Sequence, residues 1–251
     1  MRGVALSQKD DSVLFSINQI QNASLNCASE STDAVDAIGV PVATFYRAKT
    51  AEFSAENALF DMNLMATQLG TAKKIASATA KVTVPAMESF TVAEGGKYTL
   101  KHAPKAAPTE IYAINGDSTF GVKYTKATAA SDVAFAYTDA DYTLTLPTGI
   151  AIGTDMFVMY EYETENAVEV VNSATQFPVG CKFVMEVLGC DVCDQTNLIY
   201  AYLVFPNFKL SPDFDWSIAT DGAHPFSGRA QQDYCDKEKK LFSILIPGDE
   251  E

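Results

Sequence analysis

Short runs of alternating hydrophobic and polar residues dominate the chain, and this period of two is typical of β-strands with one buried face. Two such runs near the N-terminus are residues 13–20 (VLFSINQI) and 42–49 (VATFYRAK). Residues 28–41 (ASESTDAVDAIGVP) lie between them and have the small, polar and acidic composition of a loop. The N-terminal part is therefore expected to form strands joined by a loop.

One segment has the helical period instead. Its hydrophobic residues recur three or four positions apart on one face: Leu59, Met62, Met65, Ala66 and Leu69. Ser54 is a suitable N-cap, with Glu56 in the first turn and Asn57 at the third helical position. Gly70 stands where a left-handed C-terminal cap is expected. The pattern predicts a helix that begins after Ser54, ends before Gly70 and packs on the core through one face.

Residues 81–170 have only the β pattern, in short runs separated by turn residues. The runs are KYTLKHA, EIYAING, FGVKYTK, YTLTLPTG and DMFVMYEYE. Short strands at this spacing predict a small β-sandwich. Because strand patterns also occur on both sides of it, the sandwich is expected to be an insertion into one larger domain made of residues 1–80 and 171–251.

Further strand patterns follow the predicted insertion, at residues 182–190, 197–206, 213–219 and 240–247. The first two are expected to form a hairpin with a Cys-x-x-Cys sequence, Cys190 and Cys193, at its tip. The predicted fold class is mainly β: a domain that forms a β-sandwich or barrel, with one packed helix, and an inserted β-sandwich.

The charge of the chain argues against nucleic acid binding. The formal net charge is −14, which repels a polyanion. Between Lys126 and Lys182 every charged residue is an acid: Asp132, Asp139, Asp141, Asp155, Glu161, Glu163, Glu165 and Glu169. Such a run is either a solvated acidic surface or a surface that does not hold a passing polyanion.

The hydrophobic runs also bear on the compartment. None reaches the roughly 18 residues that a membrane span needs, and residues 1–15 lack the apolar segment of a signal peptide. Five cysteines are an odd number for a disulfide framework. A cytoplasmic protein, or a particle assembled in the cytoplasm, is expected.

The cysteines are the strongest candidates for chemistry. A zinc site needs four ligands, and the one conceivable set is Cys190, Cys193, Cys235 and either Cys181 or His224. There is no second Cys-x-x-Cys in the chain. A redox role conflicts with Asp191 and Asp194, which would raise the pKa of the neighbouring thiols by charge repulsion. A tight turn with reduced cysteines explains the spacing more simply, and an adventitious metal stays open.

Other catalytic patterns are weak. His224, beside Asp221 and before Pro225, is expected to be a turn residue and not a general base. Asp213 and Asp215 alternate with Phe214 and Trp216. The two acids are expected to lie on the solvent-exposed face of a half-buried strand. Residues 139–143 (DADYT) lack the glycine and the distal glutamate of a calcium loop. No enzyme, catalytic residue, cofactor site or metal site is therefore predicted.

The order of the segments carries a resemblance. The helix pattern FSAENALFDMNLMATQLG is followed by the β module, from EIYAINGDSTFGVKY to GTDMFVMYEYE, and then by PNFKL, DFDWS and PFSGRA. This layout resembles the tail tube proteins of tailed bacteriophages with an inserted immunoglobulin-like module. The resemblance covers most of the chain as a pattern, without a diagnostic motif.

The resemblance implies a virion structural protein of the phage tail, assembled in the bacterial cytoplasm. Such subunits form rings, commonly hexameric, that stack into a tube whose inner β-barrel surrounds a channel. Long loops bridge subunits and rings, and further partners are a sheath or terminator protein and a tape-measure protein. DNA passes through without specific binding, which suits a neutral or negative wall.

Two other classes of protein remain as alternatives. The first is another phage structural protein, a capsid decoration or head–tail completion protein, which would form small closed oligomers. The second is an enzyme or metal-binding domain built around the cysteines.

Overall fold

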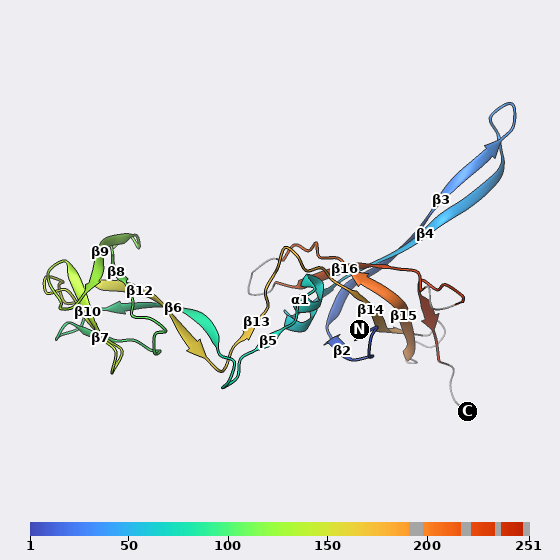
Figure 1. The fold of residues 1–251 in the computed structure, drawn as a ribbon. Coiled ribbons are helices and arrows are strands. Elements are labelled where there is room, and N and C mark those ends of the chain that lie inside the picture. The colour runs from blue at the N-terminus through green and yellow to red at the C-terminus, as the bar shows by residue number, and fades with distance from the viewer. Residues whose placement is uncertain (191–197, 217–221, 234–236, 248–251) are drawn as a thin grey trace. The chain divides into compact units, whose positions relative to one another are not determined.

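The computed structural model describes residues 1–190, 198–216, 222–233 and 237–247 (Figure 1). It divides into two compact units: unit 1 is Met1–Lys73 with Val170–Glu251, and unit 2 is Lys74–Glu169. Both units consist almost wholly of strands, and a single helix is present among the described residues. The predicted mainly β fold class is confirmed.

Unit 1 contains β1 (Arg2–Ser7), β2 (Val13–Ile17), β3 (Ile20–Val35), β4 (Pro41–Asn57), α1 (Met62–Leu69), β14 (Gly180–Cys190), β15 (Leu198–Leu210), β16 (His224–Ala230) and β17 (Ser243–Leu245). These strands form one antiparallel sheet in the order β2-β1-β14-β15-β16-β4-β3, with β17 also paired to β15. The sheet is curled into a half-barrel. The predicted hairpin is confirmed, because β14 pairs with β15 along its length.

The inner face of this sheet surrounds a core of aromatic side chains. The fully or almost fully buried rings are Phe15, Phe53, Phe183, Phe205, Phe208 and Phe226. Phe183 and Phe208 have ring centroids 5.4 Å apart, and Leu64 of α1 belongs to the same core. Gly228 is required beside this cluster, since a Cβ there would lie 2.4 Å from Cζ of Phe208. The alternate residues of each strand consequently form the outer face.

The helix is shorter than predicted. It begins after Asp61, whose carboxylate accepts hydrogen bonds from the backbone N–H groups of Asn63 (2.9 Å) and Leu64 (2.7 Å). Its end at Gly70, with φ of +67°, agrees with the prediction. The predicted cap at Ser54 is wrong, because β4 pairs with both β3 and β16 as far as Asn57. Ladder hydrogen bonds on two sides outweigh a local helix preference.

The predicted loop at residues 28–41 is also wrong. Residues 28–35 continue β3 and pair with β4, so that the hairpin turn is confined to residues 36–40. The polar composition that indicated a loop instead reflects strands that are exposed on both faces.

Unit 2 contains β5 (Lys74–Ile75), β6 (Val82–Thr91), β7 (Lys97–Thr99), β8 (Glu110–Ile114), β9 (Phe120–Ala127), β10 (Ala134–Thr138), β11 (Thr143–Thr145), β12 (Asp155–Thr164) and β13 (Val168–Glu169). Seven of them form a sheet in the order β6-β12-β8-β9-β10-β11-β7. The β9–β10 pair is parallel and the others are antiparallel. Its own core includes Ile111, Phe135, Leu144 and Met156, all fully buried.

Side chains join the two ends of this sheet, β6 and β7. Phe90 of β6 stacks on Tyr98 of β7 with centroids 3.7 Å apart. The buried Glu88 carboxylate accepts hydrogen bonds from the hydroxyls of Tyr98 (2.7 Å) and Tyr160 and from the Lys101 N–H (3.1 Å). Burial, and then the bond to Glu88, raises the pKa of Tyr98 to about 12. The sheet is thus held in a rolled form around its core.

The two ends of unit 2 are tied together by a short ladder. β5 pairs antiparallel with β13, and Lys74 bonds Glu169 at 3.1 Å. The sequence predicted that residues 81–170 form an inserted module. These boundaries and the immunoglobulin-like nature of the module stay predictions.

Candidate functional site

The outer part of the β3–β4 hairpin, residues 28–50, is called the arm; it extends from the body of unit 1 as a two-stranded ribbon (Figure 1). Its turn is built locally: the Asp36 carboxylate accepts from the N–H groups of Ile38 and Val40, each at 2.9 Å. Gly39 adopts a φ of +86°, which favours glycine. Residues 28–35 span about 25 Å at ~3.4 Å per residue.

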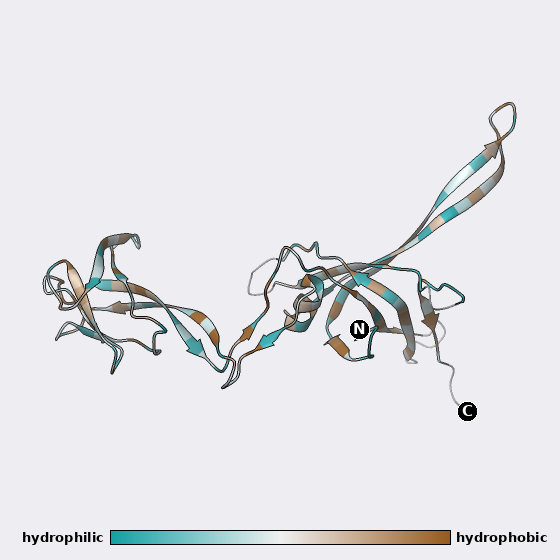
Figure 2. Ribbon diagram, viewed as in Figure 1, coloured by the Kyte–Doolittle hydropathy of each residue, from teal (hydrophilic) through white to brown (hydrophobic). Residues whose placement is uncertain are grey.

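The arm packs on no other described part of unit 1. Figure 2 shows hydrophobic and hydrophilic residues mixed along the arm. All its residues are exposed except the half-buried Thr50, and six of the exposed side chains are large and apolar: Val35, Ile38, Val40, Val42, Phe45 and Tyr46. Its side-chain contacts include the Glu30–Arg47 ion pair (3.2 Å) and the Thr44–Asp33 hydrogen bond (2.7 Å). Exposed pairs stabilise little, and an isolated two-stranded ribbon is marginal in water. The arm is therefore an exposed, partly apolar ribbon that its own side-chain contacts stabilise little.

The outer face of β3, β4, β16 and the end of β15 is hydrophilic and is called the polar strip. One row across the strands is Ser24, Ser54 and Ser227, and the next is Asn26, Glu52, Arg229 and Lys209. Arg229 donates from Nε to Glu52 at 3.0 Å. A hollow of about 650 Å³ runs over these rows. The centre of the strip thus has small hydroxyl side chains and one neutralised ion pair, and the exposed Lys209 adds a positive charge at its β15 end.

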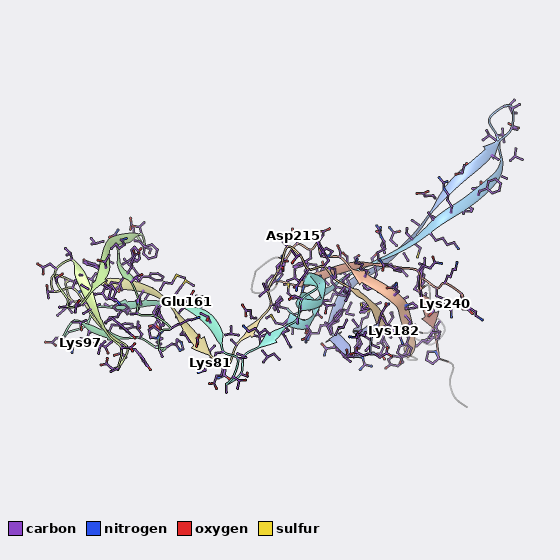
Figure 3. The ribbon with its side chains drawn as sticks, viewed as in Figure 1. Lys81, Lys97, Glu161, Lys182, Asp215 and Lys240 are labelled. Atoms are coloured by element: carbon purple, nitrogen blue, oxygen red, sulfur yellow. The ribbon has the colours of Figure 1, made fainter. Side chains whose placement is uncertain are left out.

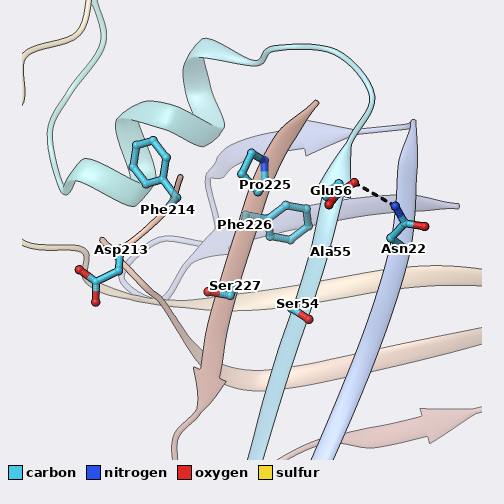
Figure 4. Close-up of a pocket in the computed structure, with 9 residues that line it drawn as sticks. All are labelled: Asn22, Ser54, Ala55, Glu56, Asp213, Phe214, Pro225, Phe226 and Ser227. Carbon is cyan, nitrogen blue, oxygen red and sulfur yellow. Dashed lines mark hydrogen bonds between the residues drawn. The ribbon is translucent and has the colours of Figure 1, made fainter. Parts of the chain in front are cut away.

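A smaller hollow of about 190 Å³ continues the strip toward α1 (Figure 4). Asn22 donates to Glu56 at 2.9 Å on one side of it, and Asp213 and Phe214 lie on the other. Both hollows are open and shallow. They suit contact with a surface better than enclosure of a small ligand.

The outer face of β1, β14, β15 and β17 is different and is called the apolar face. Val4, Val184 and Val204 form a row across three strands. Arg2, Glu186, Tyr202 and Leu245 form the next row, with Leu188 opposite Tyr200 beyond it. Leu188, Tyr200 and Leu245 are each about half exposed. The opposite face of β14 and β15 is core, and their outer face has these apolar side chains beside the charged Lys182 and Glu186.

His224 is not the predicted turn residue. It begins β16 and is fully buried, with Nε2 2.8 Å from Oε1 of Gln68. The Asp61 N–H donates to Nδ1 at 3.3 Å, so the proton resides on Nε2. Burial lowers the pKa of His224, and the charge of Asp61 partly offsets this. The side chain joins β16 to α1, and Asp221, its suggested partner, lies outside the described residues.

The strand predicted around Asp213 and Asp215 is also wrong, since residues 211–216 are irregular. The N–H of Ser211 bonds the Ser227 carbonyl, and Pro212 then has no N–H to continue a ladder. Trp216 stacks on Phe60, with centroids 4.5 Å apart. The two acids therefore have no common strand face, and Asp215 is exposed (Figure 3).

The cysteine candidates are only partly described. Cys181 is buried, donates to the Phe208 carbonyl at 3.3 Å and has its pKa raised to about 12 by burial. Cys190 ends β14, whereas Cys193 and Cys235 lie outside the described residues. Within the described ranges no three His, Cys, Asp or Glu side chains are grouped as metal ligands. Cys181 and His224 are both engaged in unit 1, and the proposed metal set stays untested.

Sequence reasoning missed the arm. The available signal was the series Val35, Ile38, Val40 and Val42, which places apolar residues in a segment otherwise read as polar loop. The sequence pattern alone does not distinguish apolar residues that stay exposed on the surface from apolar residues that are buried in the core.

Comparison with known proteins supplies the family. No curated protein matches the chain. No helix in the described part of the chain is long and apolar enough to cross a membrane. A family model covers residues 3–243, and so includes both units. On this match, the chain belongs to the YomU/Tube protein family, whose name points to a tube-like structural protein of phages.

Proposed function

We propose that this chain is the subunit of a phage tail tube, forming rings, commonly hexameric, that stack around a central channel. The family match supports a tube-like structural role at the coarse level. The observation that carries the finer proposal is the arm, since a ribbon that packs on nothing in its own unit needs a neighbour to cover it.

The ends of the unit 1 sheet support assembly through strand pairing. β2 and β3 stand at the two ends of the strand order, so each has one backbone edge without a partner in that order. An unpaired edge is a template for a strand of another chain. Pairing the β3 edge of one copy with a free edge of the next would join half-barrels into a continuous barrel around the channel.

The polar strip has the chemistry expected of the channel wall. Ser24, Ser54 and Ser227 present neutral hydroxyls, and Arg229 is neutralised by Glu52. Lys209 is the one further cation in these rows, and a wall with so little positive charge would hold a passing phosphate backbone only weakly. DNA would then move through without specific binding. This proposal is testable with Ser54→Lys, which should leave assembly intact and slow DNA passage in reconstituted phage.

The remaining parts of the proposal concern unit 2 and the partners. Unit 2 is an immunoglobulin-like module that decorates the tube and is dispensable for its assembly. The protein acts without catalysis and without a cofactor, and its further partners are a sheath or terminator protein and a tape-measure protein. A variant lacking residues 82–168, closed by a short linker, is expected to form tubes.

Electron microscopy of the purified protein tests the tube directly. Wild-type protein is expected to form rings or tubes with an open centre as its concentration rises. Phe45→Asp on the arm should prevent this, while Phe120→Asp on unit 2 should not; the two side chains are 64% and 61% exposed and form a matched pair. Equal effects of the two variants would count against a special role for the arm.

Two results would overturn the proposal. One is a wild-type protein that stays monomeric at every concentration. The other is a small closed oligomer without stacking, which would favour a capsid decoration or head–tail completion protein.

A further inference from the structure

The apolar face lies on the solvent side of a sheet whose other side is already core. Val184 of β14 lies between Val4 and Val204, and each of these positions alternates with a core residue along its strand. Exposed apolar patches of this kind mark contact sites between proteins. Val4, Val184 and Val204 are half-buried, whereas Leu188, Tyr200 and Leu245 around them are each about half exposed, so the apolar surface open to contact lies mainly at these three residues.

The arm is the second uncovered apolar surface of the same unit. Phe45 and Tyr46 are 64% and 70% exposed, and Val42 is 72% exposed. We infer that the apolar face binds the arm of a second copy of this chain. The inference rests on the proposed tube and adds which surface receives the arm.

The charges of the two surfaces are complementary. The outer part of the arm, residues 31–46, contains Asp33 and Asp36 and no lysine or arginine. Lys182 stands on the apolar face opposite Leu6 (Figure 3), and Arg2 and Glu186 neutralise each other at 3.1 Å. The face is thus apolar with one added positive charge, and the arm is apolar with negative charge near its tip. Complementary charges favour this pairing over face to face, which would bring two copies of Lys182 together.

The arrangement also explains how copies add without limit. Each copy supplies one arm and one apolar face, and the two surfaces are different patches of the chain. Such a head-to-tail contact generates rings or filaments, whereas a self-complementary patch stops at a dimer. An arm of about 25 Å, at ~3.4 Å per residue, is long enough to lie across several strands spaced about 4.8 Å apart.

A charge placed on the apolar face tests whether this face binds the arm of a second copy. Val184→Asp should raise the concentration needed for tube assembly at least about tenfold, because a carboxylate would be desolvated in the contact. Ser54→Asp is the matched control, since it puts the same group on the outer face of the same sheet but in the polar strip. Both variants should keep the wild-type far-ultraviolet circular dichroism spectrum.

A mixing experiment identifies the occupant. Phe45→Asp copies retain the face, and Val184→Asp copies retain the arm. Each alone should stay monomeric by light scattering, and an equimolar mixture should give a species of twice the monomer mass. If Phe45→Asp copies still pair while Val184→Asp copies do not, the face contacts itself and the inference is overturned.

A charge exchange adds a test that does not touch the apolar contact. Lys182→Glu and Asp33→Lys should each weaken assembly by about two- to tenfold, and the double variant should recover most of the loss. Lys209→Glu on the polar strip should not rescue Asp33→Lys. If Val184→Asp copies form tubes as well as wild-type protein does, the binding of the arm to the apolar face is refuted and the tube is not. If wild-type protein never assembles, the tube is refuted as well.

Discussion

The β3–β4 hairpin has two regions that share the same pair of strands but differ in their surroundings. At its base Phe53 is 2% exposed among four aromatic partners of the core, whereas Phe45, on the arm of the same strand, is 64% exposed. Both residues pair with β3, on either side of a register shift between Ala28 and Glu30. The ladder is therefore not what makes the base stable; the second partner strand and the buried side chains are.

The comparison explains why one hairpin serves two purposes. The base lies between β3 and β16 and gives unit 1 part of its core. The arm keeps its hydrophobic residues for another molecule and forms a defined turn around Asp36 in advance. A surface shaped before binding loses less conformational entropy on assembly.

Amide hydrogen exchange should show the largest contrast between the two regions. In unassembled protein the arm amides should exchange with almost no protection, while those of residues 51–57 should be protected by several orders of magnitude. Mass spectrometry of exchanged peptides measures this, before and after assembly. Strong arm protection in the monomer would mean that the ribbon is stable by itself, and protection unchanged on assembly would exclude it from the contacts.

Truncating each phenylalanine should separate folding from assembly. Phe53→Ala should lower the free energy of unfolding of unit 1 by about 3–5 kcal/mol. Phe45→Ala should change it by less than about 0.5 kcal/mol and still impair tube formation. Denaturant unfolding followed by the fluorescence of Trp216, the single tryptophan, reports on unit 1. Comparable losses for the two variants would remove the distinction between base and arm.

Unit 2 provides an independent region for comparison. Tyr98→Phe removes one donor from the buried Glu88 carboxylate and should destabilise unit 2 by about 1.5–3 kcal/mol. Exchange of β6 and β12 amides should accelerate, while the Trp216 transition of unit 1 stays in place. Tyr112→Phe, at the half-exposed Glu110, is the control and should cost less. A shift of the Trp216 transition would show that the units unfold together.

A smaller effect is expected at the base on acidification. Burial holds the pKa of His224 below 6.5, so the unfolded chain binds this proton more readily than the folded one. The contribution of neutral His224 to stability should be complete above about pH 6.5 and decline as the pH falls toward the folded pKa, by about 1.4 kcal/mol for each unit between the unfolded and folded pKa. Urea titrations at pH 7.5 and 5.5, read by Trp216, measure the decline. His224→Gln should reduce it, and an identical profile in that variant would assign the decline to other groups.

The sequence supported the local features that depend on period and on single residues. Alternation indicated the strands of both units, and Gly70 marked the end of α1 because only a left-handed residue fits there. The tube resemblance rested on the order of segments, and the family match agrees with it at the coarse level. The start of α1 could not be predicted, because Ser54 is a good cap and equally a good strand residue when β3 and β16 flank it.

What the sequence by itself determined is thus the class of the fold and the acidity that disfavours binding of DNA. Which hydrophobic residues are core and which are left for a partner was decided only by tertiary structure. Phe45 and Phe53 have the same local pattern on one strand, and only the pairing of β4 with β16 buries the second. The physical reason is that burial belongs to the packing of distant segments, whereas period and composition are local.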